Sequence, residues 1–161
     1  MRLPLPIARR WAYIVEFDPE LREGLEQSVR RAQPKGLRVS SFAAASQFVE
    51  AFGKQRLGRH DLVLLFAAYE FVPYLAERCA GAMRGGQLHL FELAREEQLG
   101  HPQPRVLPKD DDLRARVEGI VLLLAGRHSL ALRRRRARWS VALWLVALVA
   151  VVVRLGLRAM A

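Results

Sequence analysis

The chain has 161 residues, of which 52% are hydrophobic and 26% charged, and its formal net charge is +10. A single cysteine, Cys79, cannot close an intramolecular disulfide, which excludes a disulfide-stapled secreted domain and fits a reducing cytoplasm. An isolated thiol in an apolar helical pattern is usually a small core residue, so we assign Cys79 no chemistry.

After a lead of ten residues, short apolar runs alternate with helical patterns. Asp18 stands at an N-cap position with Pro19 at the first helical position, so a helix is expected there. Residues 61–66 are an unbroken apolar run, which is typical of a central strand covered by helices on both faces. The expected strands are 11–16, 37–42, 61–66, 87–91 and 105–107, and the expected helices are 19–33, 43–52, 70–83, 92–98 and 111–125.

Five strands that alternate with five helices require right-handed crossovers, with helices on both faces of the sheet. The predicted fold class is therefore α/β, with a doubly wound, five-stranded parallel sheet. Residues 11–126 are enough for one such domain with one core. We expect residues 127–138 to be a basic collar and residues 139–161 a single membrane helix.

The collar and the apolar tail form the most distinctive part of the chain. Residues 139–153 carry no charge, but 15 helical residues span only about 22 Å of the ~30 Å hydrocarbon core. Because Arg154 and Arg158 can snorkel, a helix over residues 139–161 reaches about 34 Å and would span. The alternatives are an interfacial helix, which would need a charged stripe, or a buried helix. The boundary residues are Trp139 and Trp144, and the collar arginines are Arg133, Arg134, Arg135, Arg136 and Arg138.

The charge of the chain is concentrated in this tail. Seven of the 26 basic residues belong to it, which leaves 19 against 16 acidic residues in the preceding domain. Basic residues beside an apolar segment suit anionic lipid headgroups, at about 1 kcal/mol each. We predict no nucleic-acid partner, because no stripe of basic and aromatic residues is visible. The basic flank stays in the cytoplasm, so a single-pass, tail-anchored protein with a cytoplasmic N-terminal domain is expected.

Four segments of the domain carry a family resemblance. Residues 12–22 look like a first strand followed by an acidic loop, residues 39–48 like a second strand and helix, and residues 61–65 like a third strand. Residues 106–113 are similar to a lysine turn and the helix that follows it. In this order, the segments resemble the receiver domain of bacterial two-component response regulators. The resemblance implies a flavodoxin-like sheet.

The resemblance also implies a phosphorylation pocket, from which this chain departs. The family uses an aspartate at the end of the third strand as phosphoacceptor, two acidic residues after the first strand for Mg²⁺, a hydroxyl after the fourth strand, and a lysine. Phe66 stands at the phosphoacceptor position and has no nucleophilic oxygen. The acidic pair falls on Glu16 and Phe17, and Lys109 is retained.

We therefore expect a degenerate phosphorylation pocket made of Glu16, Phe17, Asp18, Phe66 and Lys109. The two aromatic rings would fill the place of the ion. Glu16, Asp18 and Lys109 would cap helices or pair with one another, in preference to holding a metal or a phosphate. No metal site or cofactor is predicted, because the four histidines stand apart and residues 110–112 suit an N-cap.

The leading hypothesis is a non-enzymatic module for protein interaction in bacterial signalling or scaffolding, with an unidentified partner protein or a second copy as its target. Receivers commonly use their last helix for such contacts, and residues 120–124 are apolar beyond what one buried stripe needs, so Leu122 and Leu123 are the expected partner face. One alternative is a TIR-like nicotinamide-nucleotide hydrolase with Glu77 or Glu70 as the acid. Another is regulation by a ligand bound non-covalently at Glu16, Asp18 and Lys109.

Overall fold

The computed structural model describes residues 8–32, 36–95, 98 and 105–159, and the side chains of these residues except 135, 136 and 150–159. The chain forms two compact units, Met1–Ala125 and Gly126–Ala161. The expected roles of the Arg135, Arg136 and Arg154 side chains lie outside the described residues.

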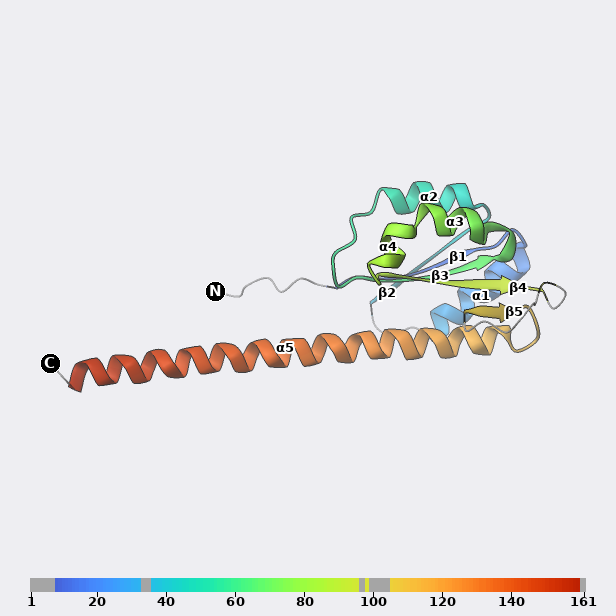
Figure 1. The fold of residues 1–161 in the computed structure, drawn as a ribbon. Coiled ribbons are helices and arrows are strands. Elements are labelled where there is room, and N and C mark those ends of the chain that lie inside the picture. Colours follow the sequence, from blue (N-terminus) through green and yellow to red (C-terminus); the bar gives the residue numbers. More distant parts are fainter. Residues whose placement is uncertain (1–7, 33–35, 96–97, 99–104, 160–161) are drawn as a thin grey trace. The chain divides into compact units, whose positions relative to one another are not determined.

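Within the described part of the first unit, five strands form one parallel sheet in the order β2-β1-β3-β4-β5 (Figure 1). This is the doubly wound, flavodoxin-like order, in which the direction of winding reverses next to β1. The predicted α/β class and all-parallel sheet are confirmed. The strands are β1 Arg10–Val15, β2 Leu37–Phe42, β3 Leu62–Ala68, β4 Leu88–Ala94 and β5 Val106–Pro108.

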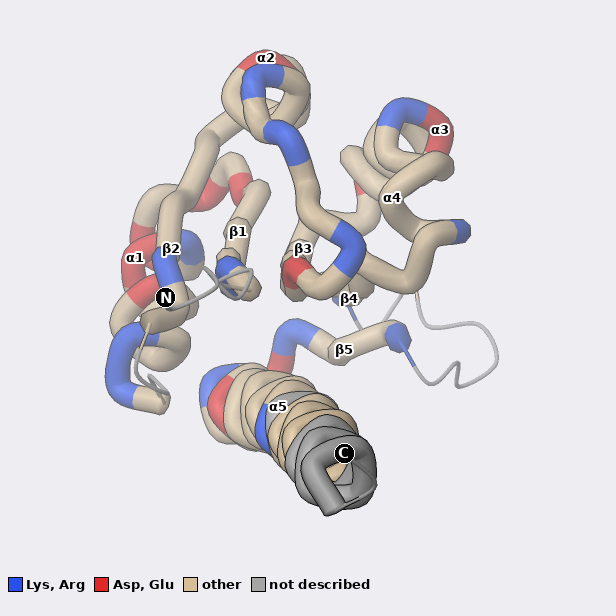
Figure 2. The backbone as a smooth tube through the Cα atoms, turned by 90° about the vertical axis from the view of Figure 1, so that its left-hand side faces the viewer, with Lys and Arg blue, Asp and Glu red and all other residues tan. Residues whose placement is uncertain are grey.

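Helices cover both faces of the sheet. The helices α2 (Ala45–Gly53), α3 (Val72–Arg78) and α4 (Ala80–Arg84) lie on one face, and α1 (Pro19–Arg31) lies on the other with the first part of α5 (Figures 1 and 2). A 3₁₀ turn, η1 (Tyr69–Phe71), joins β3 to α3. The helix α5 runs over Leu113–Ala159, so it begins in the first unit and continues into the second.

The core consists of two layers, one on each side of the sheet. Along β1, Ala12 and Ile14 face α1 and α5, whereas Trp11 and Tyr13 face α2 and α3. Every residue of β3 is buried, as its unbroken apolar run predicted. Cys79 is buried in the layer under α2 and α3, which confirms its assignment as a core residue.

The largest differences between the predicted and observed elements of the domain concern the ends of β3 and β4 and the helices expected after them. The strand expected to end at Phe66 continues to Ala68, and the helix expected over residues 70–83 is η1 followed by two helices that meet at Cys79. The helix expected over residues 92–98 was wrong at its start, because β4 continues to Ala94. Glu92 and Leu93 pair with both β3 and β5, and Ala94 pairs with β5; this pairing overrides the local helix propensity of the segment.

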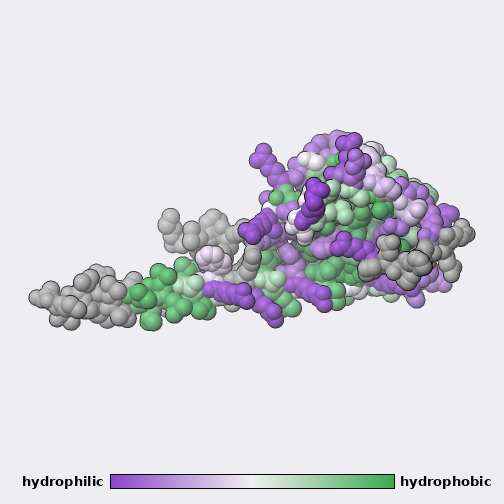
Figure 3. All heavy atoms as spheres, viewed as in Figure 1, coloured by the Kyte–Doolittle hydropathy of each residue, from purple (hydrophilic) through white to green (hydrophobic). Residues whose placement is uncertain are grey.

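In the second unit, the described residues are helical through residue 159. Every side chain from Trp139 to Val149 is exposed, and all but Ser140 in this run are apolar. Figure 3 shows this run in green after the purple arginines. Over the described part of the chain, no helical stretch combines the length and the apolar character needed to cross a bilayer.

Candidate functional site

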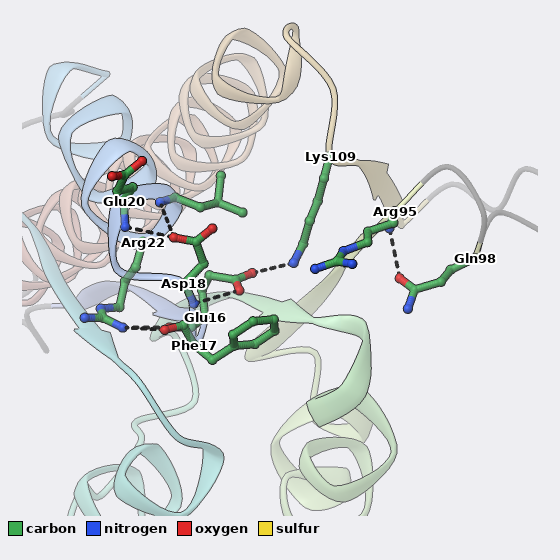
Figure 4. Close-up of polar contacts among 9 residues, drawn as sticks. Glu16, Phe17, Asp18, Glu20, Arg22, Arg95, Gln98 and Lys109 are labelled. Carbon is green, nitrogen blue, oxygen red and sulfur yellow. Dashed lines mark hydrogen bonds and ion pairs between the residues drawn. The ribbon is translucent and has the colours of Figure 1, made fainter.

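A hollow of about 350 Å³ lies at the carboxyl-terminal edge of the sheet. Parallel strands place the loops that follow them at one edge, and in doubly wound sheets ligands bind at this edge, near the reversal of winding. The loops after β1, β4 and β5 contribute to the hollow, together with the first turns of α1 and α5 (Figure 4). The lining residues are Glu16, Phe17, Asp18, Leu21, Arg95, Lys109, Asp110 and Leu113.

Glu16 and Lys109 form a buried ion pair at the base of this hollow. The Glu16 side chain is 0% exposed and that of Lys109 only 11%, and Lys109 Nζ lies 2.7 Å from Glu16 Oε2. Glu16 Oε1 accepts a hydrogen bond of 3.2 Å from the backbone N–H of Asp18. Among the described residues, Oε2 receives no directed hydrogen bond, so Lys109 alone balances its charge. Such a pair, held away from water, is only weakly screened.

Asp18 is occupied by the start of α1. Its Oδ1 accepts hydrogen bonds from the backbone N–H groups of Glu20 at 3.0 Å and Leu21 at 3.3 Å, as the predicted N-cap requires. Arg22 Nη1 donates to the backbone oxygen of Glu16 at 2.9 Å, which ties the β1–α1 loop to the helix. Pairing between Glu16 and Lys109 and capping by Asp18 were the roles expected of these residues, and the geometry confirms both.

The two phenylalanines do not lie as expected. Phe17 is 47% exposed at the rim of the hollow, and Lys109 Nζ lies 5.4 Å from the centroid of its ring, within the range of a cation–π contact. Phe66 is fully buried and does not line the hollow; its ring stacks on Phe91 with centroids 5.2 Å apart. The prediction that both rings plug the pocket was therefore wrong. The cause is the two further strand residues after Phe66, which place it inside the sheet.

The structure thus brings together Glu16, Phe17, Asp18 and Lys109, and it leaves Phe66 in the core. It adds Arg95, which directly follows β4 and whose guanidinium group points toward Lys109 (Figure 4). The sequence did not indicate Arg95, because β4 was expected to end three residues earlier than it does. A prediction that β4 extends to Ala94 would have placed Arg95 at the carboxyl-terminal edge of the sheet.

Asp110 lies just before α5, and its side chain forms a local turn with Asp112 instead of the N-cap expected for residues 110–112. Its Oδ1 accepts hydrogen bonds from the backbone N–H of Asp112 at 3.1 Å and from Arg116 Nη1 at 3.0 Å. The same guanidinium group forms an ion pair of 2.8 Å with Asp110 Oδ2. Asp110 therefore faces the hollow with a carboxylate that is already paired.

Other candidate residues lie away from this hollow. Glu70 and Glu77 are exposed on η1 and α3. Burial raises the pKa of the Cys79 thiol, which keeps it protonated and a poor nucleophile. Within the described residues, no group of three histidine, cysteine or acidic side chains is arranged to hold a metal ion. His101 lies outside the described residues.

Leu122 and Leu123 lie on the exposed side of α5, as expected from the sequence. Val117, Val121 and Ala125 are fully buried against the sheet, whereas Leu122 and Leu123 are 56% and 53% exposed. Residues four apart share one face of a helix, so the buried stripe leaves these two leucines outside it.

The hollow can hold charge, but its described lining offers no hydroxyl, thiol or imidazole nucleophile. No protein-family model and no curated protein matches the chain.

Proposed function

We propose that this chain is a membrane-anchored module for protein interaction, built on a receiver-like domain that has no phosphorylation chemistry. The observation that carries the proposal is the state of the expected phosphorylation pocket at the carboxyl-terminal edge of the sheet. There, the ammonium group of Lys109 is neutralised by Glu16, and Phe66 is buried two residues before the end of β3. A phosphoryl group would find neither an acceptor carboxylate at Phe66 nor an unpaired lysine.

The fold and one long-range contact support the receiver-like part of the proposal. The observed strand order is one that receivers share with flavodoxins. Glu16 after β1 and Lys109 after β5 are far apart in the sequence, yet they meet at 2.7 Å. An acidic residue after the first strand and a lysine after the fifth are the two members of the receiver pattern that this chain retains.

The tail supports the membrane part of the proposal. The exposed apolar side chains between Trp139 and Val149 form a continuous surface of the kind that lipid or another protein normally covers. Arginines precede this run, including the exposed Arg133, Arg134 and Arg138, and they suit anionic headgroups. This arrangement holds the N-terminal unit on the cytoplasmic face.

A flotation experiment tests the anchor. The full chain, reconstituted with phosphatidylcholine vesicles, is expected to float with them and to resist extraction at alkaline pH. A chain that ends at Ser129 is expected to stay behind. If the full chain and the chain that ends at Ser129 float to the same extent, the proposed anchor is wrong.

Treatment with a small-molecule phosphodonor tests the absence of phosphorylation chemistry. Intact-mass spectrometry is expected to show no phosphoryl adduct on the full chain in the presence of Mg²⁺. An adduct on any aspartate would overturn this part of the proposal.

The partner face is tested by substituting exposed leucines. Leu122→Asp/Leu123→Asp is expected to leave thermal unfolding nearly unchanged, because both side chains are more than half exposed, and to reduce self-association or partner recovery from membranes. Ala115→Asp, at another exposed position of α5, is the matched control. If the double substitution changes neither association nor recovery, the partner lies elsewhere.

A second candidate function is non-covalent binding of a small anion, and Arg95 is the observation that favours it. Its exposed guanidinium group points toward Lys109, so two cationic groups meet in one hollow. Thermal unfolding with and without Mg²⁺ and a phosphate analogue decides this function, since a ligand that binds the folded state raises the unfolding temperature. Stabilisation that Arg95→Gln abolishes would support it, and no stabilisation would reject it.

A further inference from the structure

A second hollow, of about 670 Å³, lies at the opposite, amino-terminal edge of the sheet. The segment before β1 and the loop between α2 and β3 line it, and both precede neighbouring parallel strands. Figure 2 shows basic residues gathered around the starts of β1 and β3. Three arginines line this hollow, namely Arg9, Arg56 and Arg59, and Asp61 is its one acidic lining residue.

Asp61 connects the two segments that line this hollow. Its side chain is buried, its Oδ1 accepts a hydrogen bond of 2.8 Å from the backbone N–H of Arg9, and its Oδ2 accepts one of 2.7 Å from that of Gly58. The carboxylate therefore joins the two loops through their backbones. Among the described residues, it forms an ion pair with none of the three arginines.

The three arginine side chains are exposed, and no carboxylate among the described residues forms an ion pair with them. By contrast, Lys54 at the same edge pairs with Glu50 at 2.7 Å. Basic residues in the last turn of a helix are explained by its dipole, but these three lie outside the helices. Their charge is therefore available to an external anion.

Within the first unit, α5 runs toward this same edge. Leu113 lines the hollow at the carboxyl-terminal edge, and α5 then runs back along the sheet. Twelve residues later, Ala125 is about 18 Å away, close to the full length of a six-residue strand. Ala125, the last residue of the first unit, therefore lies toward the edge that carries the three arginines.

We propose that Arg9, Arg56 and Arg59 dock this edge of the domain onto anionic phospholipid headgroups of the membrane that holds the tail. This inference rests on the proposed insertion of the tail. Guanidinium groups bind phosphate oxygens in a bidentate manner, which suits a headgroup surface. A single-stranded nucleic acid would call for a series of aromatic side chains for base stacking, and no phenylalanine, tyrosine or tryptophan lines this hollow.

A fluorescent label near the hollow can report this docking in the full chain. Gly53, at the end of α2, is exposed, and a Cβ there would meet no atom within 4 Å, so Gly53→Cys provides the attachment site. The native Cys79 is buried, so maleimide is expected to label the exposed new cysteine in preference to it. Vesicles carry a quencher on the lipid headgroups and consist of phosphatidylcholine alone or mixed with phosphatidylglycerol.

Quenching is expected to be strong only in the mixed vesicles. Each arginine near an anionic surface changes the ratio of docked to undocked domain about fivefold, so Arg56→Gln/Arg59→Gln lowers this ratio about 25-fold. The matched control is Arg114→Gln/Arg116→Gln, which removes the same charge at the start of α5. It is expected to change the ratio less than twofold.

Quenching that is equal in both kinds of vesicle, or equal for the two double variants, would overturn docking. So would an RNA oligonucleotide that displaces the domain from mixed vesicles and whose binding requires Arg56 and Arg59, because the partner would then be nucleic acid. Resistance of the chain to alkaline extraction from phosphatidylcholine vesicles reports the tail alone. If alkaline extraction removes the chain from the vesicles, the proposed anchor fails. If the chain resists extraction and quenching does not depend on Arg56 and Arg59, only the docking inference fails.

Discussion

Replacing Lys109 by methionine tests whether the Glu16–Lys109 pair is a structural element of the domain. The substitution keeps the length of the side chain and removes its charge, which leaves Glu16 buried without a counter-ion. Breaking a buried pair in this way costs about 3 to 5 kcal/mol. Because Lys109 is 11% exposed, some water reaches the site, so we expect about 3 kcal/mol, near the lower end. In thermal unfolding, that corresponds to a fall of about 10 to 15 °C.

The assay is urea unfolding of the full chain in mild detergent, followed by the fluorescence of the buried Trp11. Phenylalanine replaces Trp139 and Trp144 in all variants so that only the domain is observed. Glu16→Gln and the double variant Glu16→Gln/Lys109→Met complete a double-mutant cycle. Glutamine keeps an acceptor for the backbone N–H of residue 18 but carries no charge, so the double variant should recover at least half of the loss.

Lys54→Met is the matched control. Lys54 lies 2.7 Å from Glu50, the same distance as in the buried pair, but both side chains are about three-quarters exposed. Water screens this pair, so its loss should not measurably change stability. The reasoning is refuted if Lys109→Met costs no more than Lys54→Met, or if the effects of the two single substitutions simply add in the double variant.

Three further predictions concern the same domain. Asp18→Ala removes the N-cap of α1 and should lower the free energy of unfolding by about 1 kcal/mol, with no loss for Asp18→Asn, which keeps the acceptor. Phe66→Ala should cost about 3 to 5 kcal/mol, because it empties a fully buried site stacked on Phe91; a cost below about 1 kcal/mol in urea unfolding would contradict that burial. Ser41 Oγ donates a hydrogen bond of 2.6 Å to Glu26, and this bond is the main cause that lowers the pKa of the Glu26 carboxyl group. The carboxylate therefore stabilises the fold at pH values above its unfolded pKa of about 4.3. This contribution is lost as the pH falls through the folded pKa. Ser41→Ala should therefore cost about 1 kcal/mol at pH 7, and urea unfolding at several pH values should show the difference closing below about pH 4.

Local patterns were sufficient for much of the fold. An N-cap at Asp18 followed by proline is recognisable within a few residues, and the structure has the helix where this pair predicts it. The unbroken apolar run at residues 61–66 indicated a strand buried on both faces, and this too is observed. Alternation of such elements was enough to predict an all-parallel sheet, because right-handed crossovers leave few other arrangements.

The ends of the strands depended on pairing between distant segments. Residues 92–94 have good helix formers, yet they continue β4 because Glu92 and Leu93 pair with strands on both sides and Ala94 pairs with β5. This shift of three residues decides that Arg95 reaches the hollow. In the same way, two additional residues of β3 move Phe66 from the expected pocket into the core.

The sequence by itself determined the fold class, the N-cap at Asp18, the buried central strand and the separation of a basic, apolar tail from a nearly neutral domain, because each depends on neighbouring residues. Only the tertiary structure decided which charged groups meet. Lys109 finds Glu16 across the sheet, and Arg9 joins Arg56 and Arg59 at the opposite edge through Asp61. Strand order and register set these contacts, and both follow from packing over the whole domain, which no short stretch of sequence contains.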